Sequence, residues 1–69
     1  MRVRTVRELG GLVRERREAL GWSQQALSER AGTSREWIVR LEAGKPGVRM
    51  DRVFDVIGAL GLVVELEQR

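Results

Sequence analysis

The chain of 69 residues carries 13 Lys+Arg against 10 Asp+Glu, has neither Cys nor His, and is long enough for one domain. It can form no disulfide and lacks both the commonest metal ligand and the usual general base, so regular helix packing or self-association must stabilise it. Residues 1–49 carry 11 basic and 6 acidic side chains, net +5, whereas residues 50–69 carry 2 and 4, net −2, which indicates a polyanion-binding body and an acidic C-terminus.

Glycines divide the chain into four segments with helical periodicity. A glycine follows each segment, at the position where a helix C-terminus favours a left-handed residue: these are Gly21, Gly32, Gly44 and Gly61. The pattern predicts helices at about residues 6–20, 24–31, 35–43 and 49–60.

The first helix begins with a capping box, in which Thr5 is the N-cap and Glu8 the third helical residue. Gly10 and Gly11 lie inside this helix, where each costs about 1 kcal/mol relative to alanine. Two such residues predict that another element packs closely against the helix at that point.

The second and third helices are joined by a very short turn. Ser23 is the expected cap of the second helix, and either Thr33 or Ser34 caps the third. Two short helices joined in this way and braced by another helix predict a helix-turn-helix unit.

The third helix has two distinct faces at 100° per residue. Ile38 and Leu41, with Trp37 beside them, are expected in the core. The opposite face carries the candidate base-reading residues Arg35, Glu36, Val39 and Arg40. Arginine can bond guanine at two atoms, glutamate accepts from cytosine, and an apolar side chain contacts a thymine methyl. The glutamate is equally well placed to cap its own helix.

The last segment changes period after the fourth helix. Apolar residues alternate from Leu62 to Glu67, which predicts a β-strand at about 62–67. A single strand cannot satisfy its own backbone, so we expect it to pair with a second copy and form a homodimer. The expected dimer contacts are Leu62, Val63, Val64 and Leu66, with the fourth helix as the alternative interface.

Several motifs resemble the phage-repressor-type (Cro-like, XRE) helix-turn-helix family over about residues 6–61. They are Leu20-Gly21, Ser23-Gln24, Ala31-Gly32 and Leu41-Glu42-Ala43-Gly44-Lys45. The resemblance implies a mainly α, four-helix Cro/lambda-repressor-like fold, here one domain spanning residues 1–69. Within the family, the strand-like tail is most similar to the HipB-type antitoxin repressors.

The resemblance also implies roles for individual residues. Gln24 and Lys45 match phosphate-contacting positions, and Ser23 and Ser34 stand at the helix N-termini, which favour anions. Arg17 and Glu42 match a structural ion pair between the first helix and the end of the third. Arg35, Glu36 and Arg40 match the base-reading positions.

These features favour a sequence-specific DNA-binding repressor that binds a palindromic operator as a homodimer. The HipB-like resemblance implies a second activity, the binding of a HipA-like toxin kinase. The alternatives are a stand-alone regulator without a toxin, and an interaction module that has lost DNA binding. We expect no enzyme activity, catalytic residues, cofactor or metal site. No apolar run approaches the roughly 20 residues of a membrane span, so we expect a cytoplasmic protein without a membrane partner.

Overall fold

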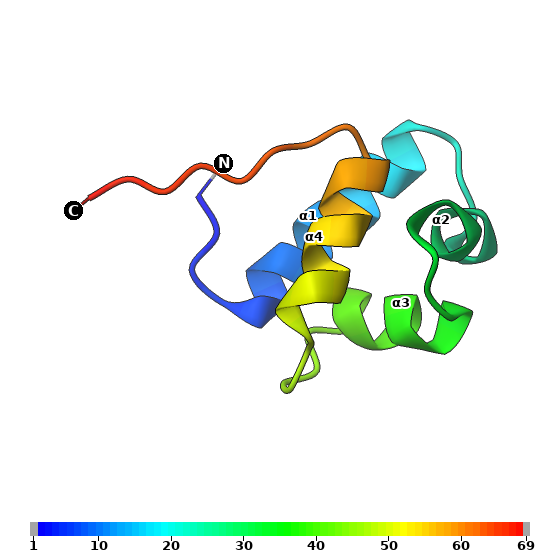
Figure 1. Ribbon diagram of the computed structural model, residues 1–69, viewed down its shortest axis with the longest axis horizontal. Coiled ribbons are helices and arrows are strands. Elements are labelled where there is room, and N and C mark those ends of the chain that lie inside the picture. The colour runs from blue at the N-terminus through cyan, green and yellow to red at the C-terminus, as the bar shows by residue number, and fades with distance from the viewer. Residues whose placement is uncertain (1, 69) are drawn as a thin grey trace.

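The computed structural model describes residues 2–68 and contains four helices: α1 (Val6–Ala19), α2 (Gln24–Ala31), α3 (Arg35–Glu42) and α4 (Met50–Ala59). Helix α3 packs against α1 and α2, and α2 also packs against α4 (Figure 1). The predicted mainly helical, four-helix class is therefore confirmed. Among residues 2–68, no helix is both long and apolar enough to cross a membrane.

Serine and threonine side chains fix the start of three helices. The hydroxyl of Thr5 accepts a hydrogen bond from the Glu8 amide at 3.0 Å, and that of Ser23 accepts from the Ala26 amide at 3.0 Å. At α3 the cap is Ser34, whose hydroxyl accepts from the Trp37 amide at 3.1 Å. Each bond satisfies an amide that has no partner within its own helix. Of the two candidate caps of α3, the structure selects Ser34.

The core draws apolar side chains from all four helices and from the residue that follows α4. Each of its members is at most 8% exposed: Val13, Leu27, Ile38, Leu41, Val53, Val56, Ile57 and Leu60. Trp37 is only partly buried and packs at the margin of this cluster rather than inside it. Because Ile38 and Leu41 are fully buried, the opposite face of α3 points to solvent.

Helices α1 and α3 cross at a glycine. A side chain at Gly10 would overlap the backbone carbonyl of Leu41, whereas one at Gly11 would meet nothing within 4 Å. The expected close packing is therefore found at Gly10, and the expectation was wrong for Gly11, which faces solvent. A second close approach follows α3, where Gly44 has φ of 75° and a side chain would lie 2.8 Å from Arg7 Cα.

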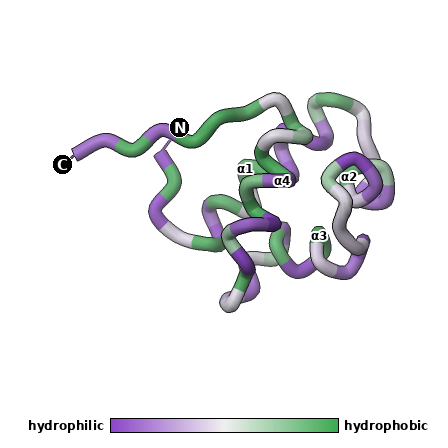
Figure 2. Tube along the Cα trace, in the orientation of Figure 1, coloured by the Kyte–Doolittle hydropathy of each residue, from purple (hydrophilic) through white to green (hydrophobic). Residues whose placement is uncertain are grey.

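The C-terminal segment, residues 62–68, does not form the predicted strand at 62–67. No strand is present anywhere in residues 2–68, and at the start of this segment the Leu62 amide donates to the Ile57 carbonyl at 3.0 Å. The alternating pattern is real, but a strand needs a second backbone to pair with, and the N-terminal residues 2–4 do not supply one. Figure 2 shows that the segment remains rich in hydrophobic residues.

The two glycines of α1 provide a matched pair of substitutions. We expect Gly10→Ala to lower the free energy of unfolding by about 1–3 kcal/mol, because the added methyl group must displace the backbone of α3. Gly11→Ala should raise it by about 0.5–1 kcal/mol, because alanine is the better helix residue and the site is open. Urea unfolding at one fixed protein concentration measures both. Equal effects at the two positions would contradict the close crossing.

Candidate nucleic-acid interface

A tight turn orients α3 relative to α2. Helix α2 ends at Gly32, whose φ of 70° is left-handed, and Ser34 already caps the next helix. The Thr33 amide donates to the Ser28 carbonyl at 3.0 Å, while the Thr33 hydroxyl accepts from Arg52 Nη1 at 3.1 Å. The turn is thus held by α2 through the backbone and by α4 through a side chain.

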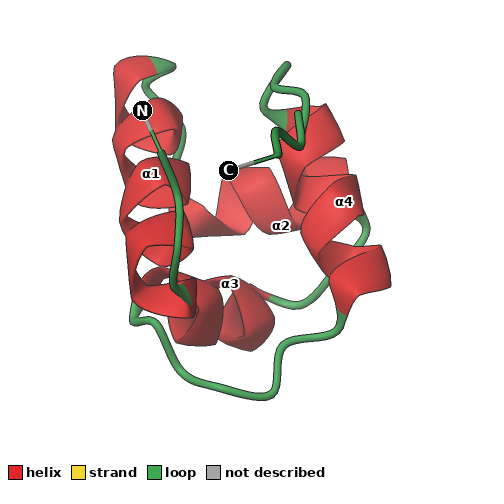
Figure 3. Cartoon of the chain, turned by 90° about the vertical axis from the view of Figure 1, so that its left-hand side faces the viewer, coloured by secondary structure: helices red, strands yellow, loops and turns green. Residues whose placement is uncertain are grey.

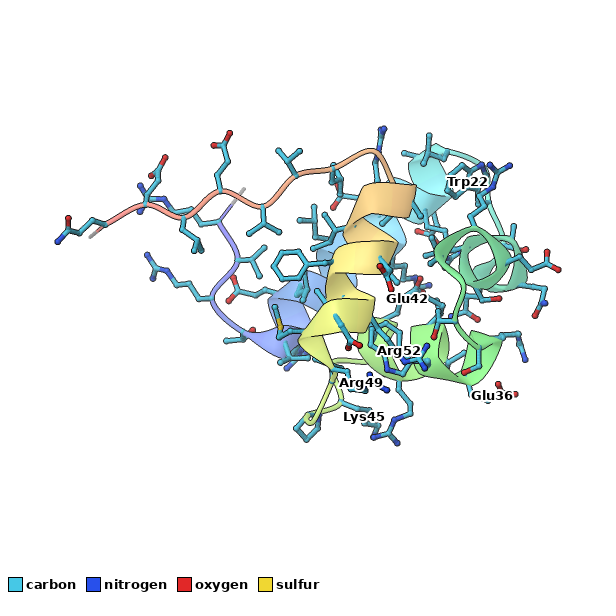
Figure 4. The ribbon with its side chains drawn as sticks, in the orientation of Figure 1. Trp22, Glu36, Glu42, Lys45, Arg49 and Arg52 are labelled. Atoms are coloured by element: carbon cyan, nitrogen blue, oxygen red, sulfur yellow. The ribbon has the colours of Figure 1, made fainter. Side chains whose placement is uncertain are left out.

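The outer face of α3 carries the predicted base-reading residues. All four are exposed to solvent, and Val39 is 39% exposed despite being apolar: they are Arg35, Glu36, Val39 and Arg40. Because Ser34 is the cap, the Glu36 carboxylate is not needed at the helix N-terminus, and it makes no hydrogen bond among those found in residues 2–68. Figure 4 places Glu36 on α3 and Lys45 in the following loop along one edge of the molecule, far from Trp22.

A buried ion pair lies behind this face. Arg17 Nε lies 2.7 Å from Glu42 Oε2, and Arg17 Nη2 lies 3.0 Å from Glu42 Oε1, so the pair is bidentate. The two side chains are only 10% and 4% exposed. Arg17 Nη1 also donates to the Trp22 carbonyl at 2.8 Å. The hydrogen bond to Glu42 raises the pKa of Arg17, against the lowering effect of burial, so the guanidinium stays charged.

Gln24 joins the same network, which the sequence did not reveal. Its Nε2 donates to Glu42 Oε1 at 3.1 Å, across 18 residues of sequence. The amide at the first turn of α2 is therefore held in one orientation by the ion pair. Gln24 lines a small depression between α1, α2 and α3, together with Arg14, Val39 and Ala43.

The other predicted phosphate-binding residues lie at the ends of helices. Ser23 and Ser34 are exposed N-caps of α2 and α3, and Lys45 is exposed in the loop that follows α3. Helix N-termini present amides with partial positive charge, which favours a phosphate close by. Ser34 and Lys45 thus lie at the two ends of α3, whereas Ser23 lies at the start of α2.

Two arginines near the start of α4 have partners within the chain. Arg49 donates to the Asp51 carboxylate at 3.2 and 2.6 Å, and this contact lowers the pKa of Asp51. Arg52 is half-buried and bonds Thr33, as described above. The partner of Arg49 is local, two residues along the chain, whereas that of Arg52 lies 19 residues away in the turn before α3 and could not be read from residue type.

Comparison with protein families and curated sequences gives consistent matches. A model of the helix-turn-helix domain family matches residues 8–69. An HTH-type transcriptional regulator of Sinorhizobium fredii, y4mF, is 35% identical over 65 residues, which cover 94% of this chain and 86% of the relative. Another HTH-type transcriptional regulator, from Methanothermobacter thermautotrophicus, is 38% identical over 50 residues, or 72% of each protein.

Solved structures show the same fold. A chain in the structure of a HipA-HipB-O2-O3 complex superposes with a TM-score of 0.90, at 19% identity, and covers 99% of this chain and 96% of that one. The restriction-modification controller protein C.AhdI from Aeromonas hydrophila superposes with a TM-score of 0.77, at 28% identity, over 84% of each chain. At 19% identity the first match concerns the fold alone.

The buried ion pair can be tested against an exposed one. We expect Glu42→Gln to lower the free energy of unfolding by about 3–5 kcal/mol, because the guanidinium of Arg17 stays buried without its counter-charge. Glu18→Gln makes the same change in the exposed Arg14–Glu18 pair, 3.4 Å apart, and should cost no more than about 1 kcal/mol. Urea unfolding followed by circular dichroism measures both values. A similar cost for the two variants would mean that burial of the Arg17–Glu42 pair has no energetic consequence.

Proposed function

The chain belongs to the helix-turn-helix transcriptional regulators of the XRE (Cro-like) type, and from this premise we propose that it is a sequence-specific repressor that reads DNA through α3 as a homodimer. The observation that carries the proposal is the solvent-facing side of α3. It presents two arginines, a free carboxylate and one apolar side chain on a helix whose other side is locked into the core. A helix of this kind fits the major groove of B-DNA.

The chemistry of this face suits base recognition. Arg35 and Arg40 each carry a planar guanidinium that can donate to guanine O6 and N7 together. Glu36 can accept from the amino group of cytosine, because Ser34 already caps the helix. Val39 offers an apolar contact to a thymine methyl group. These four residues are our candidates for direct readout.

Contacts to the DNA backbone would position this helix without reading sequence. Ser23 and Ser34 bring helix N-termini to the phosphates, and Lys45 adds a positive charge beside the end of α3. Gln24 is held by Glu42 at 3.1 Å and keeps its second amide hydrogen for a phosphate oxygen. Because such contacts release counterions, affinity for every sequence should fall as salt rises.

Homodimerisation would place two copies of α3 on one face of the duplex. A two-fold dimer reads half-sites one helical turn apart, roughly 34–36 Å, so the operator should be palindromic. Exposed apolar residues on α4 and the C-terminal segment support such an interface: Met50, Phe54, Val63, Val64 and Leu66. The C-terminal segment leaves the molecule on the side away from α3 (Figure 1).

A narrower candidate function is that of a HipB-like antitoxin that also restrains a HipA-like toxin kinase. The observation that favours it is the TM-score of 0.90 with a chain of the HipA-HipB-O2-O3 complex. Co-expression with the product of the neighbouring gene tests it: a stable complex that inhibits that product supports the antitoxin, and no complex supports a stand-alone regulator. An interaction module that does not bind DNA fits less well, because it has no need of exposed Arg35, Arg40 and Lys45 on one edge.

Substitutions on α3 should separate specificity from general affinity. We expect Arg35→Ala and Arg40→Ala each to cost about 1–3 kcal/mol on the operator and much less on scrambled DNA, because only the operator supplies the matching guanines. The operator is first identified by sequencing the fragments that the purified protein retains. Fluorescence anisotropy at about 150 mM salt, within the range where backbone contacts are already weakened, then measures both affinities.

Arg30→Ala is the matched control for these variants. It removes the same charge from α2, but Arg30 stacks on the Trp22 ring at 4.2 Å, remote from the α3 face. It should leave the preference for the operator unchanged. Equal losses on operator and scrambled DNA for the α3 variants would assign their arginines to phosphates, and a wild-type protein without sequence preference would overturn the proposed function.

A further inference from the structure

The N-terminal and C-terminal segments form opposite walls of a groove. Residues 2–4 run beside α1, and residues 62–68 leave the end of α4 (Figure 3). Both line one groove, whose floor is made by apolar side chains of α1 and α4, among them Leu12 and Val53. Its volume of about 1160 Å³ exceeds the 300–1,000 Å³ that is typical of small-ligand pockets. A polypeptide segment is therefore a better occupant than a small molecule.

Exposed apolar side chains line this groove. Leu66 is 93% exposed, Val63 80% and Met50 57%. Outside the α3 face, every large exposed hydrophobic residue found in residues 2–68 lies on the N-terminal segment, α4 or the C-terminal segment. A concentration of this kind on one side of a small chain marks an interaction surface.

The two walls also carry complementary charge patterns. The N-terminal wall reads Arg2-Val3-Arg4 and the C-terminal wall reads Glu65-Leu66-Glu67, so each has an apolar residue between two like charges. In extended backbone, residues two apart point to the same side. The spacing of the two arginines therefore matches the spacing of the two glutamates when the segments lie side by side.

Within the described residues 2–68, these charges form no ion pair with one another. The ion pairs found in residues 2–68 are Arg14–Glu18, Arg17–Glu42 and Arg49–Asp51, none of which joins the two walls. The start of the C-terminal segment is also fixed, because Arg16 Nε donates to the Leu60 carbonyl at 3.0 Å. Beyond Leu62, which packs against the core, the segment carries exposed Val63, Val64 and Leu66, and its glutamates have no ion-pair partner within residues 2–68.

Resting on the homodimer of the proposed function, we propose that the groove of each copy receives the C-terminal segment of the other. Glu65 and Glu67 of the second copy pair with Arg2 and Arg4 of the first, and Leu66 of the second copy covers Val3. A two-fold axis repeats the contact, so that both grooves are filled at once. The N-terminal arginines then contact the second copy of the chain and not the DNA.

Two charge-reversed variants test the pairing. One carries Arg2→Glu with Arg4→Glu, and the other carries Glu65→Arg with Glu67→Arg. Alone, each sets like charges against each other in its own homodimer, and its dissociation constant should rise at least about tenfold, a penalty that like-charge juxtaposition can supply. In an equimolar mixture both contacts become complementary, so a heterodimer should form with about wild-type affinity. Sedimentation measures the affinities, and native mass spectrometry identifies the heterodimer by mass.

Matched controls reverse the same number of charges elsewhere. Arg14→Glu with Arg30→Glu is the control for the first variant, and Glu15→Arg with Glu29→Arg for the second; all four residues are exposed and outside the groove. Both controls should dimerise as the wild type does. Recovery of the dimer only in the mixture supports pairing between copies.

The other outcomes overturn the proposal in distinguishable ways. Two weakened variants without recovery in the mixture would place the charge contacts within each chain. Variants that dimerise normally would show that the charges are not used, and a dimeric Arg2→Glu/Arg4→Glu variant that loses operator affinity would assign the arginines to DNA. None of these results affects sequence-specific binding by the wild type. A wild-type protein that is monomeric, on and off the operator, would overturn the proposed homodimer as well.

Discussion

The buried contact between Arg17 and Glu42 is the constraint on which the arrangement of the helices depends. Apolar burial is non-directional, and the packing of side chains between helices still allows several crossing angles. The bidentate pair at 2.7 and 3.0 Å is directional. It joins α1 to the last residue of α3, and through bonds to Trp22 and Gln24 it also fixes the start of α2. Its value lies in specifying one geometry, since a buried ion pair by itself adds little net stability.

The ion pair forms only because α1 and α3 approach closely. Gly10 allows the Leu41 carbonyl to lie against α1, and Gly44 allows the chain to pass Arg7 immediately after α3. Both contacts and the ion pair hold the C-terminal half of α3. In its N-terminal half Ile38 is buried, while Arg35 and Glu36 on the opposite face are exposed to solvent. The packing that holds this helix therefore leaves exposed the face that we propose reads DNA.

The sequence predicted those features that depend on near neighbours. The period of the apolar residues located the helices, and the spacing of Thr5 and Ser23 to the first turns located two caps. Features that depend on a residue far away in the sequence could not be predicted as well. Thr33 and Ser34 are both good caps, and only the position of Arg52 shows why the Thr33 hydroxyl is engaged elsewhere.

Other departures from prediction also come from distant partners. No local pattern distinguishes Gly10 from Gly11, because they differ only in that the backbone of α3 packs against Gly10 and not against Gly11. The alternation at residues 62–67 has the right period for a strand but no second backbone in the chain to pair with. The bond from Gln24 to Glu42 spans 18 residues, so no helical or strand period could signal it.

Helix α4 connects the helix-turn-helix unit of α2 and α3 to the C-terminal segment. At its start, Arg52 bonds the turn between α2 and α3, and just beyond its end the Leu60 carbonyl accepts from Arg16 of α1. The first contact ties α4 to the helix-turn-helix unit of α2 and α3, and the second holds the start of the C-terminal segment against α1. These contacts therefore help to set the angle between α3 and the C-terminal segment. In the homodimer that we propose, the half-site spacing depends on that angle, so side-chain contacts at the two ends of α4 would help to set which operators the dimer spans.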